Sequence, residues 1–171
     1  MNERTGVITF KGNPLTLVGT PVAVGQKAPG FTVLANDLSL KTLADFAGKT
    51  VVISAVPSLD TPICDLQTRR FNQEAAALGG NVVILTLSMD LAFAQARWCG
   101  AAGADRVVTL SDHRDASFGM AYGLLIKELR LLARAVLVVD RTGVVTYQEV
   151  VKEMASEPDY AAALAAIKAV A

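Results

Sequence analysis

The sequence predicts an α/β fold with a mixed central sheet. Two nearly uninterrupted apolar runs, 50–56 and 82–87, are typical of strands that are covered on both faces. A helical pattern from Pro62 to Leu78 separates them, so the two strands should be parallel and joined by a right-handed crossover. A strand–turn–strand pattern over 133–150 adds an antiparallel hairpin, which makes the expected sheet mixed.

Length and composition favour one globular domain that spans residues 1–171. Hydrophobic residues make up 52% of the chain and charged residues 19%, which suits a packed core and argues against disorder. The formal net charge is zero, so no basic face suggests a nucleic acid or an anionic lipid partner. No apolar run approaches the ~20 residues of a membrane span, and the N-terminus does not resemble a signal peptide. We therefore expect a soluble, cytoplasmic protein.

The first third of the chain predicts small elements. Two β-prone runs, 7–10 and 15–18, flank the turn sequence 11–14 and predict a hairpin within residues 1–19 that is added to the main fold. Residues 20–30 are rich in helix and strand breakers and predict a loop. A short strand over 31–34 and one helical turn over 43–46 should follow.

The remaining elements alternate between helices and strands. Asp90 is a plausible N-cap for a helix from Leu91 to about Gly100. A strand over 107–110, a polar loop over 111–115 and a short helix over 116–122 follow. The sequence 156–159 predicts a capped start for a last helix, in which Tyr160, Leu164 and Ile167 share one apolar stripe. This order of elements fits a thioredoxin-like fold.

The stretch from Pro57 to Cys64 predicts a reactive thiol. Thr61 can cap a helix through its hydroxyl, and Pro62 at the first helical position has no N–H to leave unpaired. Cys64 then lies among free backbone N–H groups at the positive end of the helix dipole, where the thiolate is favoured. The alternative is an inert cysteine that is buried as a small hydrophobic residue.

Arg134 begins an otherwise apolar strand. If its guanidinium is buried, it needs an anionic partner, because it keeps its charge in a protein. The alternative places it at the solvent end of the strand, paired with a surface carboxylate.

The two cysteines, Cys64 and Cys99, come without an export signal, which favours a redox or metal role over a permanent disulfide. A metal site is not expected, because the cysteines are far apart, His113 is the only histidine and no Cys-x-x-Cys occurs. We expect His113 to be solvated. Arg69 and Arg70 should be solvated or face a second copy, and Asp60 and Asp65 should be first-turn carboxylates.

Pro57, Thr61 and Cys64 match the active-site pattern of peroxiredoxins, and the segments 57–72 and 88–99 resemble the thiol peroxidase branch of that family. The resemblance implies a thioredoxin-like fold with the hairpin as an embellishment. It implies that the Cys64 thiolate attacks a hydroperoxide and becomes a sulfenic acid. It also implies that Arg134 faces Cys64 and stabilises the developing charge, that Thr61 hydrogen-bonds the sulfur or the peroxide, and that Pro57 shields the site.

The same resemblance implies that Cys99 resolves the sulfenic acid through an intramolecular disulfide with Cys64. Since both lie on helices and a disulfide needs Cα atoms within about 7 Å, local unwinding is expected. Thioredoxin as reductant, a homodimer and chemistry without a cofactor are further implications. One departure is Ala92, where the family motif has proline, which affects how the Cys99 helix begins.

Two other functions are compatible with the sequence. A redox-sensing interaction protein could use the same disulfide to alter partner binding, and a structural domain could hold two inert thiols. For a peroxidase, an apolar approach to the sulfur would favour alkyl or lipid hydroperoxides. The residues proposed to line it are Ala55, Val56, Leu59, Met89, Phe93 and Trp98.

Overall fold

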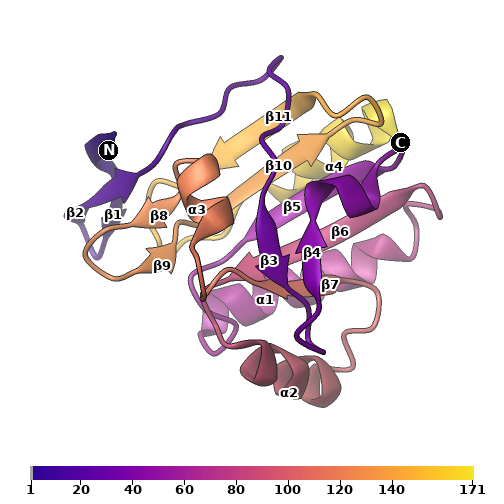
Figure 1. The fold of residues 1–171 in the computed structure, drawn as a ribbon, viewed down its shortest axis with the longest axis horizontal. Coiled ribbons are helices and arrows are strands. Elements are labelled where there is room, and N and C mark those ends of the chain that lie inside the picture. Colours follow the sequence, from indigo (N-terminus) through magenta and orange to yellow (C-terminus); the bar gives the residue numbers. More distant parts are fainter. Residues whose placement is uncertain (1) are drawn as a thin grey trace.

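A seven-stranded mixed sheet runs through the centre of the computed structural model, which describes residues 2–171 (Figure 1). Its strand order is β11-β10-β5-β6-β7-β3-β4. The strands are β3 (Thr32–Leu34), β4 (Leu40–Thr42), β5 (Thr50–Ala55), β6 (Val82–Ser88), β7 (Val108–Ser111), β10 (Ala135–Val139) and β11 (Val145–Val150). The β5, β6 and β7 strands are parallel, and the other neighbours are antiparallel. The mixed sheet of the α/β prediction is confirmed.

Both faces of this sheet are covered. The helices are α1 (Pro62–Ala75), α2 (Ala92–Ala102), α3 (Ser117–Ala121) and α4 (Tyr160–Val170), with a 3-10 turn, η1, at Leu43–Phe46. On one face, Phe71 of α1 and Ile167 of α4 pack in a cluster with strand residues such as Val52. On the other face, Leu85 and Phe118 belong to a larger cluster. Because β5 is enclosed between these layers, all six of its residues are buried, as its unbroken apolar run predicts.

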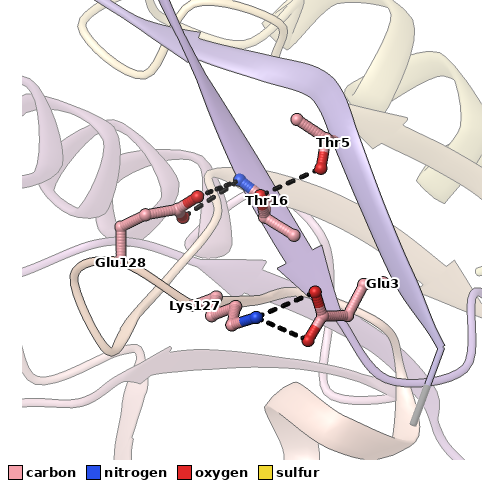
Figure 2. A network of polar contacts seen from close by, with 5 residues as sticks. All are labelled: Glu3, Thr5, Thr16, Lys127 and Glu128. Carbon is pink, nitrogen blue, oxygen red and sulfur yellow. Dashed lines mark hydrogen bonds and ion pairs between the residues drawn. The ribbon is translucent and has the colours of Figure 1, made fainter.

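The N-terminal hairpin, β1 (Glu3–Phe10) and β2 (Asn13–Val18), belongs to a second, four-stranded antiparallel sheet. Its partners are the short strands β8 (Leu125–Ile126) and β9 (Leu131–Leu132). Lys127 pairs with Glu3 at 2.7 Å, and the carboxylate of Glu128 accepts a hydrogen bond from the backbone N–H of Thr16 (Figure 2). The hairpin is therefore anchored to the segment that leads into β10.

Some predicted boundaries were wrong. Strands β4, β8 and β9 were missed, because two or three residues are too short to show an alternating pattern. Helix α1 ends at Ala75 and not at Leu78, since the chain turns before Gly79, which has a positive φ of 80°.

Two predicted helix caps were also wrong. The N-cap of α2 is Leu91, while Asp90 accepts hydrogen bonds from the Ser58 hydroxyl and the Leu59 N–H at 2.6 and 2.8 Å. The N-cap of α4 is not Ser156, as the Ser-x-x-Asp pattern of 156–159 predicts, but Asp159, whose carboxylate accepts from the Ala162 N–H. In the part of the chain that is described, no helix is long and apolar enough to cross a membrane.

Candidate active site

Cys64 lies in the first turn of α1, directly after the loop that leaves β5, and it is fully buried. Its side chain packs in a small cluster with Val56 and Leu59, against which the half-buried Trp98 of α2 also packs. Pro57 is buried in the loop that follows β5. As predicted, Pro62 opens the helix and leaves Cys64 near its unpaired N-terminal amides.

Arg134 is also buried, with only 2% of its surface exposed, and its Nη2 lies 3.4 Å from the Cys64 sulfur. The strand register explains the meeting. Arg134 immediately precedes β10, and Ala135 of that strand pairs with Ala55, the last residue of β5. The start of β10 thus lies beside the exit of β5, from which the chain enters α1. The solvent-exposed alternative for Arg134 is wrong.

Neutral groups hold the Arg134 guanidinium in place. Its Nη1 donates to Oε1 of Gln67 at 2.8 Å, and its Nε and Nη2 donate to the Met154 carbonyl at 3.2 and 2.9 Å. Gln67 is itself fixed by donating to the buried Ser54 hydroxyl of β5 at 2.8 Å. Among residues 2–171, no carboxylate lies within ion-pair distance of Arg134. The buried positive charge is therefore available to a Cys64 thiolate.

Gln67, Ser54 and the Met154 carbonyl are site groups that were not predicted from the sequence. A signal existed for the first two: Gln67 follows Cys64 by three residues, on the same side of α1, and Ser54 is a polar residue in an apolar strand. The Met154 acceptor could not be predicted, because a backbone carbonyl is supplied by every residue type and leaves no trace in the sequence.

Thr61 stands at the N-cap position of α1, but its hydroxyl does not cap the helix. It donates to the Ser58 carbonyl at 2.8 Å, within the loop that precedes Cys64. Thr61 is exposed, and no hydrogen bond joins it to the Cys64 sulfur in the structure of residues 2–171. Its hydroxyl oxygen keeps lone pairs that can accept from a further donor.

Cys99 lies in the C-terminal half of α2, and its sulfur faces β7. The Cys99 Sγ is 3.3 Å from the Thr109 hydroxyl oxygen, and that hydroxyl donates its single proton to Oδ1 of Asn36. The Cys99 thiol is therefore the donor to Thr109. Both cysteines are free thiols.

A hollow of about 360 Å³ lies between the Ser58–Asp60 loop and α2. Of the six residues proposed for an apolar approach, Leu59 and Trp98 line it. Val56 is buried beside Cys64, Ala55 and Met89 are buried in the larger core cluster, and Phe93 is 66% exposed, so these four do not line the hollow. The hollow also contains Asp60, Asp90 and Arg97, so its wall is partly polar. His113 is exposed, as predicted.

A buried cysteine at a helix start that faces a buried arginine, on a sheet of this topology, defines a thiol-redox protein with a thioredoxin-like fold. The family model for Redoxin matches residues 23–164, and the chain belongs to the Redoxin family. The solved structure of a peroxiredoxin-like protein from Aquifex aeolicus superimposes with a TM-score of 0.91 at 38% identity, covering 98% of each chain.

Within that family, the relatives identify the branch. The chain is 62% identical to a thiol peroxidase from Halalkalibacterium halodurans, over 95% of this chain and 97% of the relative. It is 60% identical to a thiol peroxidase from Bacillus subtilis strain 168, over 95% and 96% of the two chains. The chain thus belongs to the thiol peroxidases, and both the resemblance and the fold predicted from the sequence are confirmed.

Proposed function

We propose that this protein reduces hydroperoxides to water or alcohols through the Cys64 thiolate. The observation that carries the proposal is the contact between Arg134 Nη2 and Cys64 Sγ, at 3.4 Å in a buried site. A fixed positive charge beside the sulfur favours the thiolate before reaction. It also stabilises the negative charge that develops on the peroxide oxygens. The relatives named thiol peroxidase support the same chemistry.

In the first step the Cys64 thiolate attacks the terminal peroxide oxygen. An S–O bond forms as the O–O bond breaks, and the departing oxygen takes a proton and leaves as water or an alcohol. Cys64 becomes a sulfenic acid. Because Cys64 is fully buried, peroxide reaches the sulfur when the Ser58–Thr61 loop or α2 moves aside. The lone pairs of Thr61 then accept a hydrogen bond from the peroxide, and Pro57 keeps bulk water away.

In the second step the Cys99 sulfur attacks the Cys64 sulfenic sulfur. An S–S bond forms within the chain, and the sulfenic oxygen leaves as water. An external dithiol, which we propose is thioredoxin, then supplies two electrons and two protons and restores both thiols. Cys99 must first leave Thr109, so the structure as described precedes this step.

A coupled assay tests the proposal. Purified protein with thioredoxin, its reductase and NADPH should consume NADPH when hydrogen peroxide or an organic hydroperoxide is added. Cys64→Ser should abolish the turnover and remain folded, because a hydroxyl occupies less space than a thiol. Turnover by Cys64→Ser equal to that of the unchanged protein would refute the mechanism.

Three further properties are proposals from the sequence. We propose a homodimer, which sedimentation equilibrium can test. We propose a cytoplasmic location, which fits two free thiols. We also propose that residues 1–171 form one domain. The redox-sensor alternative has no observation that favours it over turnover.

A further inference from the structure

Two helices that carry the cysteines are joined by a small group of polar and aromatic side chains. Asp65, next to Cys64 on α1, accepts from Trp98 Nε1 through Oδ1 at 2.9 Å and from Arg69 Nε through Oδ2 at 2.8 Å. The Arg69 guanidinium lies over the Trp98 ring, 5.6 Å from its centroid. We call these three residues, Asp65, Arg69 and Trp98, the clamp.

The clamp also reaches the end of α2. Nη1 of Arg69 points to the carbonyl of Ala102, the last residue of α2, at 3.4 Å. A cation is favoured there, because the last carbonyls of a helix have no partner within the helix and carry the negative end of its dipole. Arg69 is exposed, as one of its predicted alternatives had it, and it also contacts the end of α2.

The clamp fixes the rotation of α2 in a way that separates the two thiols. Trp98 faces α1 and packs against the Cys64 cluster, whereas Cys99, the next residue, faces β7 and donates to Thr109. Successive residues of an α-helix point about 100° apart. To bring Cys99 to Cys64, α2 must rotate or unwind around Trp98. This movement breaks the Trp98–Asp65 hydrogen bond and the contacts of Arg69 with the Trp98 ring and the Ala102 carbonyl, while the Arg69–Asp65 pair stays within α1.

We propose that Asp65 and Arg69 are positioning residues that hold α2 in the reduced arrangement and thereby limit the rate at which the Cys64–Cys99 disulfide closes. The proposal rests on the disulfide step of the proposed function. If closure is slow, the Cys64 sulfenic acid lasts longer, so the clamp sets its lifetime. A longer-lived sulfenic acid is open to a second peroxide, which oxidises it to sulfinic acid.

The chain provides a matched control on the same helix. Arg70 Nε donates to Glu74 at 2.8 Å, and its guanidinium lies 5.4 Å from the centroid of Tyr160 on α4. Arg70 thus has the same kind of carboxylate and aromatic partners as Arg69, but it joins α1 to α4, which holds no cysteine. Arg70→Gln and Arg69→Gln remove the same charge from neighbouring positions.

The kinetic experiment separates the two steps by quenched flow, with alkylation and mass spectrometry to count sulfenic, disulfide and sulfinic forms. Asp65→Asn removes a negative charge beside Cys64, and Arg69→Gln removes a positive one, so their effects on the first step should be opposite in direction. Both should speed disulfide closure several-fold and lower the sulfinic fraction at high peroxide. Arg70→Gln should close at the unchanged rate. Closure at the unchanged rate or slower in both clamp variants would overturn the proposal.

A second measurement needs no peroxide and so stands apart from the proposed function. The reduced protein and oxidised dithiothreitol exchange two electrons and two protons to give the protein disulfide and reduced dithiothreitol. Because the clamp stabilises only the reduced arrangement, Asp65→Asn and Arg69→Gln should shift this equilibrium several-fold toward the disulfide, and Arg70→Gln should not. An unshifted equilibrium in the clamp variants overturns the inference. A shift without any oxidation of Cys64 by peroxide refutes the peroxidase function alone.

Discussion

Arg134 donates from Nη2 toward the Cys64 sulfur across 3.4 Å, although 70 positions separate the two residues in the chain. The antiparallel pairing of β10 with β5 brings them together, since Ala135 lies opposite Ala55. Arg134 directly precedes Ala135, and the chain that leaves Ala55 runs through the exit loop into the first turn of α1, which carries Cys64. The charge on Arg134 has no carboxylate partner within ion-pair distance among residues 2–171, which leaves it free to act on sulfur.

Replacing Arg134 by methionine tests this charge directly. Arg134→Met keeps an unbranched side chain but removes the charge and the hydrogen bond to Cys64. We expect the second-order rate constant of Cys64 oxidation to fall about 10²- to 10³-fold, the usual loss for one group that stabilises a developing anion. Stopped-flow fluorescence of Trp98 can follow the reaction, and circular dichroism should confirm the fold. A rate constant within twofold of the unchanged protein would contradict the assignment.

Gln67 should matter because it aims Arg134. In Gln67→Met, Nη1 of Arg134 and the Ser54 hydroxyl lose their shared partner. We expect Cys64 oxidation to slow about tenfold, since a loss of about 1.4 kcal/mol of positioning corresponds to a factor of ten.

The control for Gln67 is Gln95, which is equally buried but donates to Ser88 and the Leu110 carbonyl instead. Gln95→Met should lower the free energy of unfolding by about 1–3 kcal/mol, because it also strands buried partners. It should leave the first oxidation step unchanged. If both variants slowed that step equally, the loss would reflect general destabilisation.

Cys99→Ser should separate oxidation from turnover. Serine can donate to Thr109 as the Cys99 thiol does, so the reduced fold should survive. Cys64 should react once with peroxide at an unchanged rate, and the NADPH-coupled assay should then stop. Mass spectrometry should show the sulfinic acid accumulating on Cys64 with excess peroxide. Sustained turnover with thioredoxin would show that Cys99 is not the resolving thiol.

The sequence predicted the central sheet well, because the unbroken apolar runs 50–56 and 82–87 identify the buried strands β5 and β6 by their composition alone. The positions of Cys64 and Pro62 followed from local helix chemistry, which needs no tertiary information. The partners of Arg134 could not be found in that way. They depend on the register of β10 against β5 and on one backbone carbonyl, and neither leaves a mark in the residue pattern. Likewise, Asp90 is a residue type that often caps helices, but its carboxylate instead accepts tertiary hydrogen bonds from Ser58 and Leu59, which the local sequence does not reveal.

Glu153 connects the N-terminal hairpin to Met154, whose carbonyl accepts from Arg134, and it should make the stability of the fold depend on pH. Its carboxylate accepts from the Thr9 hydroxyl and from the N–H groups of Gly12 and Lys11. The Thr9 hydrogen bond is the largest cause that lowers the pKa of Glu153 from 4.5 to about 2. Because the folded pKa is depressed, this contribution is present above pH 4.5 and is lost as the pH falls through about 2.

The variant Glu153→Gln tests that dependence. Its melting temperature should be lower than that of the unchanged protein at neutral pH, and the two should converge as the pH approaches 2. Thermal unfolding followed by circular dichroism across this range gives the comparison. Since Met154, the next residue, accepts from Arg134, the variant should also slow Cys64 oxidation modestly at neutral pH. A gap in melting temperature that persists unchanged to pH 2 would contradict the proposed origin of the shift.

Ala92 is the first residue of α2, where the related motif has proline. The backbone conformation before this position is compatible with proline. Leu91 is extended, with φ −61° and ψ 144°, which is the conformation that a residue before proline prefers. The first N–H groups of a helix have no partner within it, so Ala92→Pro loses no intrahelical bond. We expect a gain of about 0.4–1 kcal/mol, because proline restricts the unfolded chain, or about 1–4 °C in melting temperature.

The same variant shows which end of α2 opens. Trp98 and Cys99 lie in the C-terminal half of the helix, where the N–H of Gly103, in the left-handed conformation, bonds to the Cys99 carbonyl. If opening starts there, Ala92→Pro should close the disulfide at the unchanged rate while it melts at a higher temperature. A closure rate that falls in step with the added stability would show instead that α2 must unfold from its first turn. The release of the clamp would then be a consequence of that unfolding and not its start.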